Sequence, residues 1–150
     1  DACAFSAERA GFMRSERMVQ LVQEYGAKNC IGWLHGKGGF VSLLGTNDLC
    51  EVERMIKEGD KDALLCQKAM AYQLSKCICS LLPAADGRLD AVIITGGGAY
   101  WERLTDDIRD RIGFLDTPVY IMPGENEMQA LAEGALRIMN GEEKVQQYNG

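Results

Sequence analysis

Asp90-Ala91-Val92-Ile93-Ile94-Thr95, followed by Gly96-Gly97-Gly98, is the stretch that decides the fold. This short, apolar and partly β-branched run is typical of a strand buried in a parallel sheet. The next segment repeats apolar residues at helical spacing, and residues 118–122 predict a second strand. A strand–helix–strand order implies a right-handed crossover between parallel strands, so the second half of the chain is predicted to be α/β.

The first half of the chain has mainly helical patterns. Ser15 is expected to cap a first helix that ends at Gly26. Asp48, with Glu51 three residues later, predicts a capping box at the start of a helix that runs to Glu58. These patterns place helices before the α/β unit.

The remaining segments complete the expected order. Residues 1–13 predict an irregular lead-in, and residues 40–44 a short buried strand or extended segment. Asp60 is expected to cap a long helix that ends near Pro83. A last helix, with an apolar stripe, is predicted over residues 128–139.

Composition and charge limit the classes of partner. The chain has 150 residues, 47% of them hydrophobic and 25% charged, so one globular domain is expected. A net charge of −6 disfavours nucleic acid and anionic membranes as partners. No apolar run reaches the roughly 20 residues of a membrane span, and no signal peptide opens the chain. Because the first residue is Asp1 and not Met, we expect a piece of a longer protein or a processed start.

The cysteines and the histidine show no zinc-ligand spacing. There are six cysteines and a single histidine, His35. Six cysteines in a short secreted chain would suggest a disulfide framework, but several of these fall inside helical patterns. We therefore expect mostly buried, reduced thiols in a cytoplasmic protein, and a structural role for His35.

The three glycines after the first strand are a candidate ligand-binding turn. At the carboxyl end of a parallel strand, small residues let a ligand approach the backbone, and the N–H groups of a following helix attract anions. The alternative is a tight turn without a ligand. The dinucleotide-binding pattern fails because Trp101 occupies the place of its third glycine. A P-loop around Lys37 fails because Ile31 stands where its first glycine is needed.

Three charged residues are candidates for which the pattern alone favours an ordinary role. Glu125 and Glu127 precede the last predicted helix, where carboxylates stabilise the helix dipole by about 0.3–1 kcal/mol each. The alternative is that one of them orients a hydrated Mg²⁺ on a nucleotide. Arg9 lies in a predicted loop, where a surface arginine is the ordinary interpretation.

Motifs with a common order and spacing extend over nearly the whole chain. They are Phe5-Ser6-x-Glu8-Arg9-x-Gly11, Gly36-Lys37-Gly38-Gly39, Leu44-Gly45-Thr46-Asn47-Asp48, Met70-Ala71-Tyr72-Gln73, Asp90-Ala91-x-Ile93-x-Thr95-Gly96-Gly97-x-Ala99-Tyr100, Pro123-Gly124-Glu125-Asn126-Glu127-Met128, Gly134-Ala135-Leu136-Arg137 and Gly141-Glu142-Glu143. Together they resemble the C-terminal part of the butyrate kinases, in the acetokinase family. The resemblance implies a ribonuclease H-like second domain of the actin-like ATPase superfold, an α/β fold with a partial parallel sheet flanked by helices.

The resemblance also implies a reaction and a set of site residues. The reaction is phosphorylation of a short-chain carboxylate by ATP with Mg²⁺, or the reverse transfer from an acyl phosphate. Asp48 matches a nucleotide contact, Arg9 the catalytic arginine that stabilises the transferring phosphoryl group, and Glu127 a catalytic carboxylate that positions Mg²⁺. The adenosine-binding turn matches Gly96, Gly97, Gly98, Ala99 and Tyr100. A planar guanidinium suits a phosphoryl group whose charge is spread over three oxygens.

One residue departs from the family pattern. Cys50 stands where the family's Asp-x-Arg motif has its arginine, which predicts weaker nucleotide binding. The alternative is that Cys50 packs inward beside Val52 and that Arg54, one turn further, takes the arginine's role.

The family's N-terminal domain and its Gly-rich phosphate-binding hairpin would precede Asp1. We therefore expect residues 1–150 to need the upstream half of the enzyme for activity, and the family resemblance implies a homodimer. Two other functions stay open at this point. One is a non-catalytic nucleotide-binding or assembly fragment, and the other is a relative of the acetate or propionate kinases.

Overall fold

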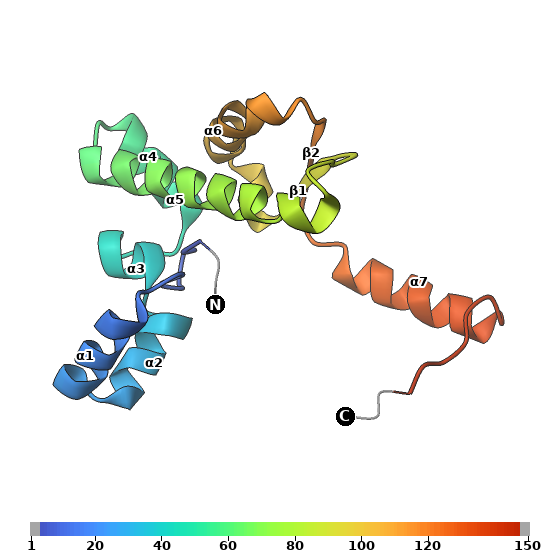
Figure 1. The fold of residues 1–150 in the computed structure, drawn as a ribbon, viewed down its shortest axis with the longest axis horizontal. Coiled ribbons are helices and arrows are strands. Elements are labelled where there is room, and N and C mark those ends of the chain that lie inside the picture. The colour runs from blue at the N-terminus through green and yellow to red at the C-terminus, as the bar shows by residue number, and fades with distance from the viewer. Residues whose placement is uncertain (1–3, 148–150) are drawn as a thin grey trace.

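The computed structural model describes residues 4–147. The helices and strands in chain order are α1 (Ser15–Tyr25), α2 (Ala27–His35), α3 (Gly39–Leu44), α4 (Leu49–Lys57), α5 (Lys61–Ser80), η1 (Leu82–Ala85), β1 (Val92–Gly96), η2 (Gly97–Tyr100), α6 (Glu102–Ile112), η3 (Gly113–Leu115), β2 (Val119–Pro123) and α7 (Glu127–Met139). Figure 1 shows a central body formed by α3 to α6 and the two strands. The α1–α2 pair lies at one side of this body, and α7 leads away from the other.

The two strands form the parallel sheet that the sequence predicts. β1 and β2 pair in parallel, with a register that runs from Val92 opposite Val119 to Gly96 opposite Pro123. Helix α6 lies in the crossover between them, and its apolar residues Leu104, Ile108 and Ile112 are buried. The predicted strand–helix–strand unit is confirmed.

The core lies between α4, α5, α6 and the first strand. Its buried apolar members are Phe5, Phe40, Val52, Ala63, Met70, Ala71, Val92, Trp101, Leu104, Ile108 and Ile112. Three aromatic rings pack edge to face, with Phe5 and Phe40 centroids 5.6 Å apart and Phe40 and Trp101 centroids 6.1 Å apart. These contacts join the N-terminal loop, α3 and the start of α6 in one apolar cluster.

The two predicted aspartate caps are confirmed. The Asp48 carboxylate accepts a hydrogen bond from the Cys50 N–H at 2.8 Å at the start of α4. The Asp60 carboxylate accepts from two N–H groups at the start of α5. The capping box predicted with Glu51 is not formed, because the Glu51 carboxylate accepts from the Thr46 hydroxyl at 2.7 Å instead.

Residues 40–44 are not a strand. They form most of α3, and the sequence patterns did not predict α2 before it. The backbone N–H groups of Phe40 and Val41 donate to the carbonyls of Ser6 and Ala7, at 3.3 and 3.0 Å. These long-range bonds favour the helix over the local β-branched and apolar composition.

Three smaller expectations need correction. Ser15 is the first residue of α1, and its cap position is Arg14. The prediction of mostly buried cysteines is wrong, because among the described residues Cys30 is buried, Cys50 is exposed, and Cys66, Cys77 and Cys79 are partly exposed. Cys3 lies outside the described residues.

Helix α7 forms where it is predicted, but it does not contribute to the core. None of its residues is buried, and Met128 and Met139 at its two ends are 80% and 81% exposed. Within residues 4–147, no helix is both long and apolar enough to cross a lipid bilayer.

Candidate functional site

A cavity of about 340 Å³ lies between the start of α4 and the turn that follows β1. It is lined by Leu49, Cys50, Glu53, Lys57, Gly97, Tyr100 and Trp101. Cys50, Glu53 and Lys57 are three and four residues apart, so they lie on one face of α4. The structure thus brings Cys50 together with Gly97 and Tyr100, two of the residues predicted to bind adenosine.

The two first glycines of the turn have different roles. Gly96 adopts a backbone conformation that requires glycine, and Gly97 leaves open space beside the backbone. Gly96 has φ +81° and ψ −174°, a conformation that essentially only glycine adopts. Its N–H and carbonyl exchange two hydrogen bonds of 3.2 Å with Gly124, which follows β2. A Cβ at Gly97 would meet no other atom within 4 Å, so this exposed position opens toward the cavity.

Two other residues of the predicted adenosine turn pack toward the interior of the protein. Ala99 is buried, and Gly98 lies against Leu104 of α6. The glycines do not stand at the N-terminus of a long helix, because the single turn η2 intervenes and α6 begins at Glu102. Since η2 has only four residues, the predicted anion site at a helix N-terminus is not formed there.

Glu53 is the most strongly bonded side chain of the cavity, and sequence analysis did not identify it. Its Oε2 accepts from Trp101 Nε1 at 2.8 Å and from Arg103 Nε at 2.8 Å. Its Oε1 accepts from Arg103 Nη2 at 3.0 Å, and Lys57 Nζ lies 3.5 Å away. The Arg103 hydrogen bonds, with the Trp101 bond and the nearby Lys57 charge, lower the pKa of Glu53 to about 2.

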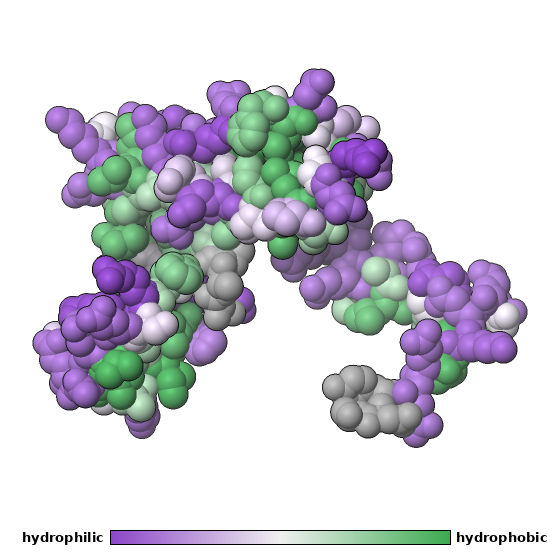
Figure 2. Space-filling view, in the orientation of Figure 1, coloured by the Kyte–Doolittle hydropathy of each residue, from purple (hydrophilic) through white to green (hydrophobic). Residues whose placement is uncertain are grey.

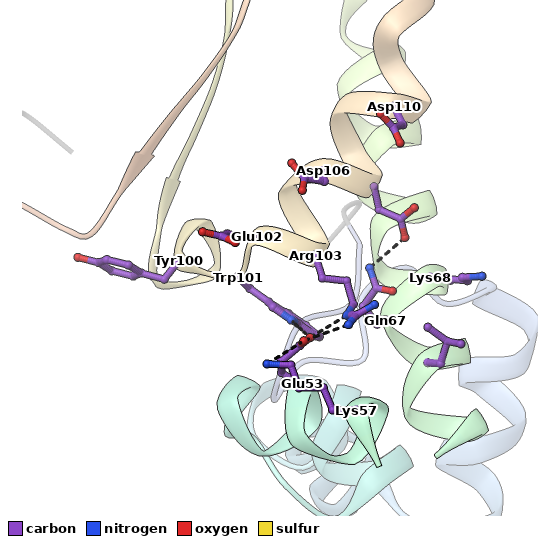
Figure 3. Close-up of a pocket in the computed structure, with 12 residues that line it drawn as sticks. Glu53, Lys57, Gln67, Lys68, Tyr100, Trp101, Glu102, Arg103, Asp106 and Asp110 are labelled. Atoms are coloured by element: carbon purple, nitrogen blue, oxygen red, sulfur yellow. Dashed lines mark hydrogen bonds and ion pairs between the residues drawn. The ribbon is translucent and has the colours of Figure 1, made fainter. Parts of the chain in front are cut away.

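A larger cavity of about 670 Å³ adjoins the first and shares Glu53, Lys57, Tyr100 and Trp101 with it. Figure 3 shows this cavity between α4, α5 and α6, with Trp101 and Arg103 pointing toward Glu53. On its far side the buried Gln67 amide donates to the Asp107 carboxylate at 3.0 Å, which joins α5 to α6. Its lining holds more carboxylates than cations, namely Glu53, Glu102, Asp106, Asp107 and Asp110 against Lys57, Lys68 and Arg103.

Arg9 lies in a loop whose backbone is fixed by close contacts with glycines. A Cβ at Gly39 would overlap the Ser6 carbonyl oxygen, and one at Gly38 the Trp33 carbonyl oxygen. The Gly38 N–H donates to the Glu8 carbonyl at 3.0 Å. Two of the recognised motifs therefore pack against each other, backbone to backbone.

The Arg9 side chain is exposed, while its backbone is held from both sides. The Arg9 N–H donates to the Ser6 hydroxyl at 3.1 Å, and its carbonyl accepts from the Ser6 N–H at 3.0 Å. The neighbouring Glu8 carboxylate accepts from the Asn47 amide, next to the Asp48 cap. The loop of Arg9 is thereby joined to the segment that begins α4.

Asp48 and Glu127 lie outside the two cavities. The Asp48 side chain caps α4, two residues before Cys50. Glu127 is exposed as the first residue of α7. No hydrogen bond or ion pair within residues 4–147 joins Arg9 to Glu127, and this part of the chain holds no group of three or more metal-binding side chains.

The inward packing of Cys50 that the alternative interpretation predicts is wrong. Cys50 does not pack inward, because it is exposed and lines the cavity, while Val52 beside it is fully buried. Arg54 does not line the cavity either. Its Nη1 donates to both carboxylate oxygens of Glu58, at 2.8 and 3.0 Å.

Residues 18–115 match the model of the acetokinase family, so the chain belongs to this family of kinases. Butyrate kinase 2 of Clostridium acetobutylicum is 42% identical over 147 residues, which are 97% of this chain and 41% of that protein. The chain thus spans about two fifths of the length of this relative.

Solved structures show the same fold. The acetate kinases of Porphyromonas gingivalis and Entamoeba histolytica match with TM-scores of 0.81 and 0.77 at 20% and 18% identity. The matches cover 91% and 89% of this chain, and 41% and 43% of those proteins. A propionate kinase of Francisella tularensis matches with a TM-score of 0.73 at 17% identity, over 84% of this chain and 39% of its own. The expected actin-like ATPase fold is confirmed.

Proposed function

We propose that this chain forms the nucleotide side of a butyrate kinase-like enzyme. The observation that carries the proposal is the 42% identity with Butyrate kinase 2 over 97% of the chain. The cavity between α4 and the glycine turn supports it, because it joins two segments to which the family resemblance gives nucleotide contacts. The resemblance also favours a cytoplasmic homodimer.

The proposed reaction is a phosphoryl transfer without redox change. A carboxylate oxygen of butyrate, or of a similar short-chain acid, attacks the γ-phosphorus of ATP. The bond from that phosphorus to the bridging oxygen breaks, and ADP leaves with the electron pair. The acyl phosphate is the product, and the reverse reaction makes ATP. Such transfers depend on positioning and charge stabilisation more than on covalent participation of the protein.

The cavity supplies surfaces suited to the base and ribose. Tyr100 and Trp101 offer aromatic faces, and Gly97 lets a ligand approach the backbone. Gly96, Gly98 and Ala99 hold the turn in shape. Asp48 acts in this proposal by fixing the start of α4, which carries Cys50 to the cavity wall.

Arg9 and Glu127 are the proposed catalytic pair, with ATP and Mg²⁺ as cofactors. The Arg9 guanidinium is exposed and can donate two parallel hydrogen bonds to the transferring phosphoryl group. Mg²⁺ keeps most of its waters and binds to nucleotide phosphates with one or two carboxylates, so one exposed carboxylate at Glu127 fits it without a protein cage. Bound there, the metal would neutralise phosphate charge.

Contacts with the phosphates and most of the carboxylate site would come from parts of the enzyme beyond these 150 residues. The relative is more than twice as long as the matched segment, and this supports the proposal. A polypeptide limited to residues 1–150 is then expected to show no turnover.

A hydroxylamine-trapping assay tests the function in the complete protein that contains these residues. With ATP, Mg²⁺ and butyrate, the acyl phosphate formed reacts with hydroxylamine, which displaces phosphate and gives a hydroxamate that is detected as its coloured complex with added iron(III). Parallel reactions with acetate and propionate test the alternative substrates. Nucleotide binding without hydroxamate from any acid would instead support a non-catalytic nucleotide-binding role.

A further inference from the structure

One carboxylate holds both walls of the small cavity together. Glu53 lies on α4, and its hydrogen-bond donors Trp101 and Arg103 lie on the segment from η2 into α6. We call these three residues the Glu53 anchor. Figure 3 shows the dashed bonds of Trp101 and Arg103 converging on Glu53.

The anchor is adjacent in sequence to the residues that line the cavity. Glu53 follows Cys50 by three residues, so the two side chains share one face of α4. Trp101 follows Tyr100 directly, and both line the cavity. A change in the anchor therefore moves the Cys50 wall relative to the Tyr100 wall.

The geometry of the anchor is specific. Arg103 donates through Nε and Nη2 to the two different oxygens of Glu53, at 2.8 and 3.0 Å. This two-pronged arrangement fixes orientation as well as distance. The third bond comes from the indole of Trp101, which is 7% exposed, while the Glu53 side chain is 20% exposed. The Trp101 bond is thus partly shielded from water, whereas the two Arg103 bonds lie at the surface, where the Arg103 side chain is 38% exposed.

Helix α4 is joined to the body by apolar packing as well as by the bonds of the Glu53 anchor. Val52 is fully buried in the core beside Glu53. Loss of the Glu53 charge therefore leaves the helix attached, but leaves its rotation and its distance from η2 less defined.

We propose that Glu53 is a positioning residue that sets the width of the nucleotide cavity by holding Trp101 and Arg103. This inference rests on the proposed nucleotide function of the cavity. It predicts that the anchor controls nucleotide affinity and leaves the carboxylate substrate unaffected, because Glu53 and Trp101 line the cavity proposed to hold the nucleotide.

The test compares Glu53→Gln and Arg103→Gln in the complete protein with Glu58→Gln as the matched control. Glu58 lies next to the C-terminal end of the same helix and also pairs with an arginine, since Arg54 Nη1 donates to both of its carboxylate oxygens, and it lines neither cavity. MgADP binding is measured by calorimetry at temperatures well below each melting point. The KM values for ATP and for butyrate are measured separately.

We expect Glu53→Gln to weaken MgADP binding about tenfold, which corresponds to about 1.4 kcal/mol. The KM for ATP should rise while the KM for butyrate stays unchanged, and Glu58→Gln should match the wild type. Arg103→Gln should weaken binding similarly, and the double variant should be no worse than the worse single one, because both act through one bond pair. Arg103→Gln alone decides the matter if Glu53→Gln does not fold.

Two results would overturn the inference, and they differ. If wild type binds MgADP and Glu53→Gln binds it equally well while only its melting temperature falls, Glu53 has a structural role alone. If wild type binds no MgADP at millimolar concentration, the proposed nucleotide function fails and the positioning role fails with it.

Discussion

The hydroxyl group of Tyr100 lies against Gly124, so closely that a Cβ at position 124 would stand 2.9 Å from the phenolic oxygen. Gly96 exchanges two backbone hydrogen bonds with the same glycine. The turns that follow β1 and β2 are therefore in contact, and this contact places Tyr100 at the rim of the cavity.

We predict that Gly124→Ala destabilises the protein and disturbs Tyr100. Position 124 has φ +97°, which costs an L-residue about 1–2 kcal/mol. The added methyl group would also push the phenol away. Urea denaturation measures the loss. Gly97→Ala is the control, because position 97 has no positive φ and no atom within 4 Å of the added methyl. Equal stability of the two variants would show that the turn tolerates a side chain at position 124.

The parts of the fold that were predictable depend on local patterns. The β1 run and the α6 stripe of Leu104, Ile108 and Ile112 have the periods of a strand and a helix, and these periods are set by burial on one side. Helix α3 was not predictable, because hydrogen bonds from Phe40 and Val41 to distant carbonyls decide its conformation.

The same limit applies to the site. The glycine turn and the Asp48 cap have local signatures, and both form. Glu53 escaped sequence analysis because its donors Trp101 and Arg103 are 48 and 50 residues away. The one available signal was its spacing of three residues from Cys50, which places both side chains on the same face of α4.

Acid should weaken the Glu53 anchor. The pKa of Glu53 is lowered from 4.5 to about 2 by Arg103, Trp101 and Lys57. The folded state therefore binds a proton at Glu53 less readily than the unfolded state does. This contribution to stability is complete above the unfolded value and is lost as the pH falls through the folded one. We expect the stability difference between wild type and Glu53→Gln to be on the order of 2 kcal/mol near neutral pH and to shrink toward about pH 2.

Urea titrations of both proteins at several pH values measure this difference. Glu58→Gln shows how much of any change comes from a carboxylate outside the anchor. A stability difference that does not vary with pH would mean that the Glu53 charge adds nothing to folding.

In the complete protein, Glu127→Gln should reduce turnover far more than stability. The exposed side chain at the start of α7 contributes at most a helix-dipole term of about 0.3–1 kcal/mol. Its proposed task, orienting hydrated Mg²⁺, requires the charge that glutamine lacks. Turnover across a Mg²⁺ titration and thermal melting are compared, with Glu133→Gln on the same helix as control. Parallel losses of activity and melting temperature would leave Glu127 as a helix-capping residue only.

Arg9→Lys should lower turnover at least tenfold at saturating substrates, because an ammonium group cannot make the two-pronged contact with a phosphoryl group. Stability should be unchanged, since the loop is held by its backbone bonds with Ser6 and not by the Arg9 side chain. Arg14→Lys, at another exposed arginine, controls for the loss of a guanidinium. Turnover near the wild-type rate in Arg9→Lys would remove Arg9 from the catalytic residues.

Cys50→Arg should restore a contact that the family pattern contains and this chain lacks. Cys50 is exposed on the cavity wall, and its role in the α4 cap is through its backbone N–H, so the substitution leaves the Asp48 cap intact. An arginine there can stack on an aromatic base, a contact worth about 0.5–1 kcal/mol when exposed and about 2 when desolvated. We expect ATP binding to tighten roughly two- to thirtyfold, with an unchanged melting temperature, since 1.4 kcal/mol is about tenfold in affinity.

Calorimetric titration with ATP in the complete protein tests this, and Cys50→Ser is the control because it removes the thiol without adding a guanidinium. An affinity that stays at the wild-type value in Cys50→Arg would show that the base does not stack against position 50. Tighter binding in both variants would assign the effect to loss of the thiol and not to the new side chain. Only a gain confined to Cys50→Arg supports a nucleotide base beside α4, because only the guanidinium can both stack on a ring and donate charged hydrogen bonds.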